Sequence, residues 1–103
     1  MTIEEFTSFI DTEILPECYK IMGSKGISYS GLEDKLGNFK RLSVLTSSSP
    51  EKVLFIYVTK HFDALSSYIR GEYKDSENIK SRILDIINYM FLLAALLKEQ
   101  NKL

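Results

Sequence analysis

Residues 83–97 read ILDIINYMFLLAALL, a run whose only strongly polar side chains are Asp85 and Asn88. The run is short for a membrane span, and both polar groups are costly in lipid. We therefore interpret it as a buried core helix and keep a membrane helix as the alternative. Because this helix is apolar nearly all round beyond Asp85, it lies at the centre of the fold or presents one face to a second copy. The second case predicts a homodimer or a higher homo-oligomer.

The N-terminal region predicts a long, irregular helix. Thr2 and Glu5 have the spacing of a capping box, and apolar residues follow at helical intervals as far as Met22. Pro16 lies inside this pattern and predicts a kink or break near Leu15. Gly23 and Gly26 are expected to end the helix, and the glycine- and serine-rich residues 23–31 are expected to form a loop.

Three more helices follow along the chain. A short one is expected over about residues 32–45, with Gly37 as a weak point inside it. A serine cap followed by Pro50 starts the next helix, which stops at Gly71. The last helix is expected from about residue 75 to about residue 98. The sequence therefore predicts a single all-α domain over residues 1–103. We expect a bundle of three long helices plus one short helix, with the apolar C-terminal helix at its centre.

Composition narrows the function. The 103 residues carry 13 basic and 14 acidic side chains, so no basic face is expected and direct nucleic-acid binding is not predicted. Cys18 is the only cysteine and His61 the only histidine. An internal disulfide and a zinc site built from cysteine and histidine ligands are therefore excluded. The first residues have neither a basic region nor a long apolar run, so no secretory signal is expected and the predicted location is the cytoplasm.

A polar face on the last helix is the sharpest signal for a site. At 100° per residue, Glu77, Ser81, Leu84, Asp85 and Asn88 fall within one broad face. A buried carboxylate costs several kcal/mol unless a partner or a metal offsets it. Two interpretations stay open. In the first, Asp85 forms a structural pair that fixes the packing of the helices; in the second, it belongs to a site for a divalent cation or a substrate.

The preceding helix carries a matching row. Lys60 and Asp63 follow one stripe of it, as a solvated ion pair or as part of a site. If this stripe faces the last helix, Asp63, Glu77 and Asp85 form a carboxylate cluster suited to Mg²⁺. We interpret His61 as a half-buried packing residue, with a catalytic base as the alternative.

Residues 28–41 read SYSGLEDKLGNFKR and mix glycines, hydroxyls, an amide and two adjacent basic residues. A loop that enters a helix can present backbone N–H groups to a phosphate, although the Walker spacing is missing. The alternative is a turn followed by an amphipathic helix.

Three blocks together resemble a known group of proteins. They are YSGLEDKLGNFKR at 29–41, KHFDAL at 60–65 and RILDIINY at 82–89, the last preceded by a glutamate. Their order is similar to that in small phage and prophage proteins called nucleotide-modification-associated domains. More distantly, the acidic motif on a late helix is similar to the all-α nucleotide pyrophosphohydrolases. The paired-glutamate motif of those hydrolases is absent, and Ser81 stands where the phage group often has an acid.

The resemblance implies roles for particular residues. Glu77 and Asp85 would bind Mg²⁺, with Asp63 as a third ligand. Lys40, Arg41 and Lys60 would neutralise phosphates, and Asn38 or Asn88 would orient the substrate.

Three functions are consistent with these patterns. The first is a phage-type accessory protein of nucleotide metabolism or modification, which binds a nucleotide-like ligand between its helices. The second is a Mg²⁺-dependent nucleotide pyrophosphohydrolase. The third is a non-catalytic homo-oligomeric interaction module that acts on a host protein, in which Asp85 and Asn88 set the helix register.

Overall fold

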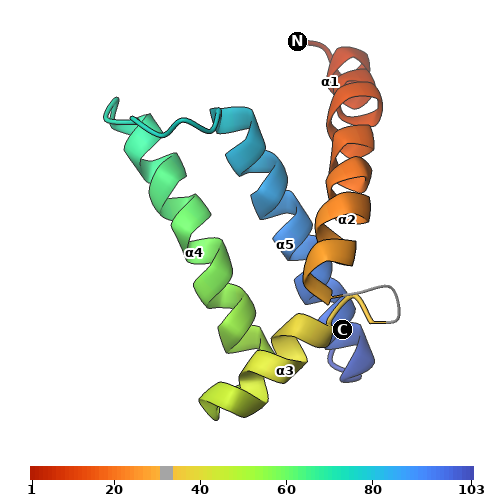
Figure 1. Cartoon of the computed structure of the whole chain (residues 1–103). Coiled ribbons are helices and arrows are strands. Elements are labelled where there is room, and N and C mark those ends of the chain that lie inside the picture. Colours follow the sequence, from red (N-terminus) through yellow and green to blue (C-terminus); the bar gives the residue numbers. More distant parts are fainter. Residues whose placement is uncertain (31–33) are drawn as a thin grey trace.

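The computed structural model describes the backbone of residues 1–30 and 34–103, and the side chains of residues 1–23 and 34–103. Figure 1 shows that the described chain is built from helices, and no strand occurs in those ranges. The predicted all-α class is confirmed. The helical segments in chain order are α1 (Ile3–Phe9), the π-helical segment η1 (Ile10–Ile14), α2 (Leu15–Ser30), α3 (Gly37–Thr46), α4 (Pro50–Ile69) and α5 (Ile79–Glu99).

The first three segments form one continuous column (Figure 1). The predicted capping box is present, because Thr2 Oγ1 accepts from the Glu5 N–H at 3.1 Å and Glu5 answers the Thr2 N–H. The irregularity expected at Pro16 is a π-helical turn immediately before it. A π turn shifts the backbone bonding, as in the bond from the Leu15 N–H to the Ile10 carbonyl, so the missing N–H of proline is accommodated without a break.

The predicted end of this column was wrong. The helix passes Gly23 and Gly26 and ends at Ser30, where a loop over residues 23–31 was expected. Glycine lowers helix propensity by only about 1 kcal/mol, which neighbouring turns can offset. The expected start of the short helix near residue 32 lies outside the described residues.

The short helix itself starts later than predicted. Its first residue is Gly37, which therefore is not a weak point in its interior. The Asp34 side chain accepts from the Leu36 N–H at 2.9 Å and holds the turn that leads into the helix.

Both ends of α4 agree with the sequence. Ser49 Oγ accepts from the Lys52 N–H at 3.2 Å, and Pro50 is the first helical residue. After the helix, Gly71 adopts φ = 75°, a left-handed conformation in which a side chain would be strained.

The last helix begins four residues after the predicted start. The stretch around Asp75 and Glu77 is a turn, and Asn78 caps α5 by accepting from the Ser81 N–H at 2.8 Å. Asn is as good a cap as Asp or Ser, so the sequence offered several candidate starts within a few residues.

The core consists of two small clusters on either side of α5. Helices α4 and α5 pack side by side, α3 packs against α4, and α2 packs against α5 (Figure 1). One cluster joins α3, α4 and α5 through Leu36, Phe39, Val53, Leu54 and Leu96. The other joins η1 and α2 to α5 through Ile14, Cys18 and Leu84. The helices that surround the space between these clusters supply the site described next.

In the described ranges, no helix combines the length and the apolar character needed to cross a membrane. The membrane alternative for residues 83–97 is therefore not supported.

Candidate functional site

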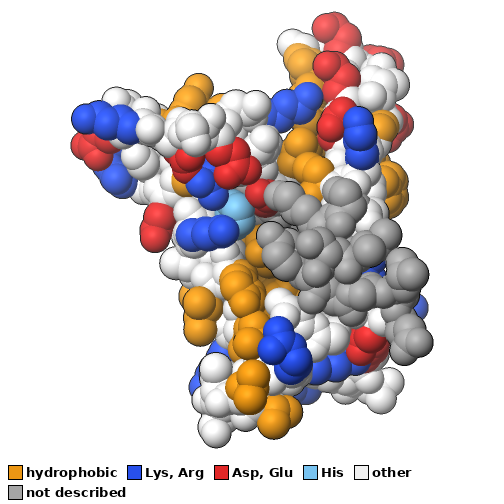
Figure 2. Space-filling model, in the orientation of Figure 1, with side chains coloured by type: hydrophobic (Ala, Val, Ile, Leu, Met, Phe, Trp, Pro, Cys, Tyr) orange, Lys and Arg blue, Asp and Glu red, His pale blue; other side chains and the backbone are white. Residues whose placement is uncertain are grey.

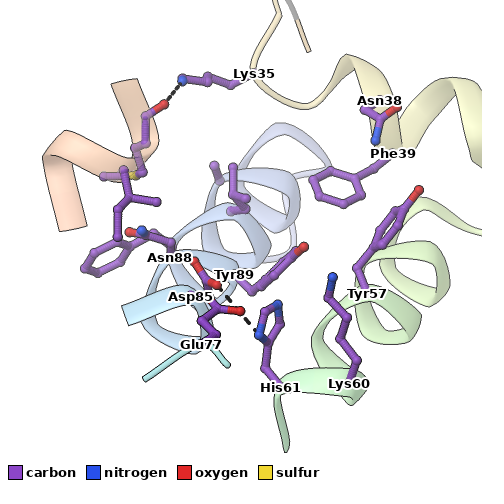
Figure 3. Close-up of a pocket in the computed structure, with 15 residues that line it drawn as sticks. Lys35, Asn38, Phe39, Tyr57, Lys60, His61, Glu77, Asp85, Asn88 and Tyr89 are labelled. Atoms are coloured by element: carbon purple, nitrogen blue, oxygen red, sulfur yellow. Dashed lines mark hydrogen bonds and ion pairs between the residues drawn. The ribbon is translucent and has the colours of Figure 1, made fainter. Parts of the chain in front are cut away.

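A pocket of about 540 Å³ lies among α2, α3, α4 and α5. Figure 3 shows it as a space whose walls come from segments far apart in the chain. Five of the eight residues that the sequence predicts for ligand or metal binding line it, namely Asn38, Lys60, Glu77, Asp85 and Asn88. The other lining residues are Ile21, Met22, Lys35, Phe39, Tyr57, His61, Tyr89, Phe91, Leu92 and Ala95. The volume is within the range of pockets that hold small molecules, roughly 300–1,000 Å³.

Asn88 is the least satisfied residue of the pocket. Its side chain is 6 % exposed, and neither Oδ1 nor Nδ2 has a hydrogen-bond partner within the described part of the chain. Leaving a buried amide unpaired costs about 1–3 kcal/mol per group. Buried polar groups in native proteins are nearly always paired, so an exception calls for an explanation. An amide at the wall of a pocket is explained by a partner that the described part of the chain does not supply.

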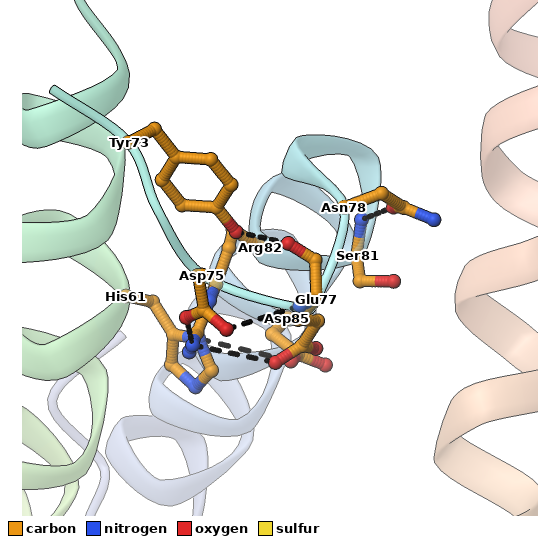
Figure 4. Close-up of polar contacts among 8 residues, drawn as sticks. All are labelled: His61, Tyr73, Asp75, Glu77, Asn78, Ser81, Arg82 and Asp85. Carbon is orange, nitrogen blue, oxygen red and sulfur yellow. Dashed lines mark hydrogen bonds and ion pairs between the residues drawn. The ribbon is translucent and has the colours of Figure 1, made fainter.

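Arg82 organises the charges beside the pocket (Figure 4). Its Nη2 donates to Asp75 and lies 3.4 Å from Glu77 Oε2, and its Nη1 is 3.1 Å from His61 Nδ1. The carboxylate of Asp75 is the main reason why the pKa of the Arg82 guanidinium is raised. One guanidinium thus offsets the acidic groups at the start of α5 and ties that turn to α4.

The protonation state of His61 follows from this contact. A guanidinium has only donors, so Nδ1 must accept from Arg82 and the ring proton lies on Nε2. Burial lowers the pKa of His61 below its usual 6.5, against the opposing effect of the Asp85 carboxylate, whose Oδ2 lies 3.7 Å from Nδ1. His61 is therefore a neutral hydrogen-bond donor at neutral pH.

Aromatic rings form one side of the pocket. Phe39 contacts Tyr57 and Tyr89 edge to face, with ring centroids 6.0 and 6.5 Å apart. The His61 ring is tilted against Tyr89 at 5.6 Å. Flat side chains in this arrangement give the pocket a wall suited to a planar ligand.

Two lysines supply positive charge at the edge. Lys60 comes from α4 and lies on the opposite side of the pocket from Asn88 (Figure 3). Lys35 lines the pocket too, and its Nζ donates to the Met22 carbonyl. This hydrogen bond joins the segment before α3 to α2. Figure 2 shows the histidine of the chain, in pale blue, with acidic and basic side chains around it. The pocket therefore combines an apolar and aromatic interior with charges at its rim.

Three residues of the predicted site lie outside the pocket lining. Lys40 makes ion pairs with Asp34 at 2.9 Å and Glu99 at 2.8 Å, and these two acceptors raise its pKa. Arg41 donates to Asn38 Oδ1 at 2.8 Å, so it contacts the pocket only through that residue. Asp63 is exposed on α4.

The three predicted metal ligands are consequently not brought together. Glu77 and Asp85 line the pocket and Asp63 does not. Within residues 1–23 and 34–103, no group of three or more His, Cys, Asp and Glu side chains is placed to hold a metal ion. Mg²⁺ is often held by one or two carboxylates together with ligand phosphates, so its binding here stays a prediction.

Sequence reasoning missed several members of the site. It gave no role in the site to Tyr57, Tyr89 or Arg82. A signal was available for Arg82, which stands three residues before Asp85 on one helix face, where the buried carboxylate required a basic neighbour. No local pattern could have linked Arg82 to Asp75, because that pairing depends on the turn before α5.

Comparison with known protein families, curated proteins and solved structures gave no match to this chain.

Proposed function

We propose that the protein binds a nucleotide-like ligand, a planar heterocycle bearing an anionic group, in the pocket among α2, α3, α4 and α5. The observation that carries the proposal is the buried amide of Asn88 at the pocket wall, whose Oδ1 and Nδ2 have no hydrogen-bond partner among the described residues. An amide presents one acceptor and two donors, which matches the hydrogen-bonding edge of a nucleobase. A ligand edge that met both atoms would remove the desolvation cost that the unliganded protein carries.

The surroundings of the amide support a base rather than a sugar or a simple anion. Met22 and Phe91 line the pocket together with Asn88, and the aromatic wall of Phe39, Tyr57 and Tyr89 offers further flat surfaces. Aromatic side chains contribute about 1–3 kcal/mol per stacked base. A nucleobase combines such a flat face with a polar edge.

The charges support an anionic tail. Lys60 lines the pocket from the side of α4 and is exposed, so it can reach a phosphate at the rim without burial. Arg82 offsets Asp75 and Glu77, which weakens their repulsion of an anion. We infer that the phosphate lies beside Lys60 and that the base lies toward Asn88.

A hydrolytic role has less support. Pyrophosphate hydrolysis needs several carboxylates around Mg²⁺, and within the described ranges Asp63 lies apart from Glu77 and Asp85. His61 offers a hydrogen-bond donor and not a base at neutral pH, because Arg82 occupies its Nδ1. The association with phage nucleotide modification stays an expectation of the sequence resemblance.

The test is a calorimetric and thermal-shift titration with nucleoside mono-, di- and triphosphates, the matching nucleosides and inorganic phosphate, each with and without Mg²⁺. A nucleotide at about 100 times its dissociation constant should stabilise the fold by about 2.7 kcal/mol. Asn88→Leu should remove this stabilisation. Lys60→Gln should weaken nucleotides more than nucleosides, whereas the matched control Lys52→Gln, on an exposed part of the same helix, should change neither.

Two outcomes count against the proposal. The first is that no compound in the panel binds wild-type protein at millimolar concentration. The second is that Asn88→Leu folds and binds the same nucleotide as tightly as wild type, which would place the ligand elsewhere.

A further inference from the structure

The two long helices that frame the pocket leave a large apolar surface on their other side. Along α4, Phe55, Phe62 and Ile69 recur at intervals of seven residues and are 65 %, 41 % and 76 % exposed. Along α5, Ile83 and Met90 recur at the same interval and are exposed as well. We call these five residues the apolar back face.

Helical geometry places the two rows on one side of the molecule. At 100° per residue, the α4 row lies about 120–180° round that helix from Tyr57 and Lys60, which line the pocket. The α5 row lies about 140–160° round its helix from Asn88. Helices α4 and α5 lie side by side and run in opposite directions (Figure 1). From the angles given above, both rows therefore face away from these pocket-lining residues.

The chain has a larger accessible surface than a typical folded monomer of its mass. Its accessible surface is 7210 Å², whereas a folded monomer of 11.8 kDa exposes about 5,900 Å². Its radius of gyration is 15.3 Å, against about 13 Å for a compact domain of roughly this length. The excess of about 1,300 Å² exceeds the roughly 800 Å² that each partner buries in a standard interface.

The back face has the size and composition of such an interface. Helices α4 and α5 contain 20 and 21 residues, so each is about 30 Å long. With neighbouring helices about 10 Å apart, the pair offers roughly 600 Å² per copy and 1,200 Å² in a symmetric dimer. Its five members are aromatic or aliphatic residues and methionine, the types that interface cores favour over charged residues.

The α4 row is also complementary to itself. The small residues Thr59 and Ser66 lie between the large ones, which gives the alternating spacing of three and four residues that helices use to pack in pairs. If two copies of α4 run antiparallel about a two-fold axis, Phe55 of one meets Ser66 of the other and Phe62 meets Thr59. Large side chains then fill the gaps beside small ones in the layers of Phe55 and Phe62.

We propose that a second copy of this chain packs on the apolar back face, so that α4 and α5 of the two copies form a four-helix bundle with one pocket on each outer side. An isologous contact of this kind is the commonest way in which identical chains associate. The proposal is independent of the ligand, because none of the five residues lines the pocket.

The test is sedimentation velocity with light scattering between about 1 µM and about 1 mM, together with circular dichroism to verify folding. Wild type should be a dimer in the upper part of this range. Phe62→Glu on α4 and Met90→Glu on α5 should each raise the dimer dissociation constant at least about 100-fold, because each buries an unpaired carboxylate. Val44→Glu makes the same change at an exposed apolar residue of α3, away from the back face, and should leave the dimer intact.

Three outcomes would overturn the proposal. Wild type that stays monomeric up to about 1 mM would mean that a different protein, or solvent alone, covers the back face. A dimer that persists in both folded glutamate variants would place the interface elsewhere. Dissociation in Val44→Glu as readily as in Phe62→Glu would show that the effect is not specific to this face.

Discussion

Nη1 of Arg82 lies 3.1 Å from Nδ1 of His61, and this contact joins the first turns of α5 to the middle of α4. The arginine is held from its other side by Asp75, in the turn before α5. A histidine that accepts from a guanidinium resists protonation, because its protonated form would present a second donor to a donor. The protonation of His61, which lines the pocket, therefore depends on Arg82, which does not line it.

Replacing Arg82 should change the acidity of His61. In Arg82→Gln the pKa of His61 should rise, because a positive charge and a donor to Nδ1 are removed while Asp85 remains nearby. Titration of the imidazole resonances by NMR measures this directly. Lys52→Gln removes a positive charge at the exposed start of the same helix and should leave the titration unchanged. A lower or unchanged pKa in Arg82→Gln would contradict the assigned hydrogen bond.

Stability should fall as the solution becomes mildly acidic. Burial lowers the pKa of His61 below 6.5, so the unfolded chain binds the proton more readily than the folded protein does. The free energy of unfolding should then be highest above pH 6.5 and should decrease as the pH falls from there through the folded-state pKa. Urea unfolding at pH 7, 6 and 5 measures this change, and His61→Gln should lose most of it. An equal decrease in wild type and His61→Gln would assign the effect to carboxylates instead.

Removing the unpartnered amide should stabilise the unliganded protein. Leucine is close to asparagine in size, and Asn88→Leu replaces by apolar groups two buried polar atoms that have no partner within residues 1–23 and 34–103. We expect the free energy of unfolding to increase by about 1–3 kcal/mol, measured by urea denaturation. Asn38→Leu is the matched control, because its Oδ1 accepts from Arg41 and no gain is expected there. A clear loss of stability in Asn88→Leu would be evidence that the amide has a partner in the folded protein.

The cap of α4 should contribute measurably to stability. Ser49→Ala removes the acceptor for the Lys52 N–H and should lower the free energy of unfolding by about 1 kcal/mol. Ser67→Ala, in the interior of the same helix, should be neutral or slightly stabilising because alanine is the better helix former. Thermal melts of the two variants and wild type at one concentration compare these effects. Equal stability of Ser49→Ala and wild type would mean that water replaces the cap without cost.

Local signals predicted the helices better than their ends. Ser49, Pro50 and Gly71 marked the limits of α4 correctly because capping and left-handed backbone are short-range effects. Gly23 and Gly26 misled the prediction because propensity alone does not stop a helix that its neighbours support. The start of α5 was ambiguous among Asp75, Ser76 and Asn78, which are all good caps.

Part of the pocket could be predicted from the local sequence pattern. Asp85 and Asn88 stood out because polar residues in an apolar run are rare, and both line the pocket. Tyr57 and Phe39 could not be recognised, since an aromatic residue at helical spacing is equally typical of a core. Which side of α4 faces α5 is decided by packing over the whole length of both helices. That choice put Lys60 at the pocket and left Asp63 in solvent.

The π-helical turn at Ile10–Ile14 sets the angular phase between the two ends of the N-terminal column. Such a turn holds one residue more than an α-helical turn, which is equivalent to a rotation of about 100°. Ile14 and Cys18 fix α2 against α5, so any change in the length of this turn is transmitted outward to α1. A one-residue deletion there would not unravel the column; it would swing Ile3 and Phe6 to a different side of the molecule. Insertions and deletions at this point would therefore rotate the exposed helix α1 about its axis relative to the rest of the fold.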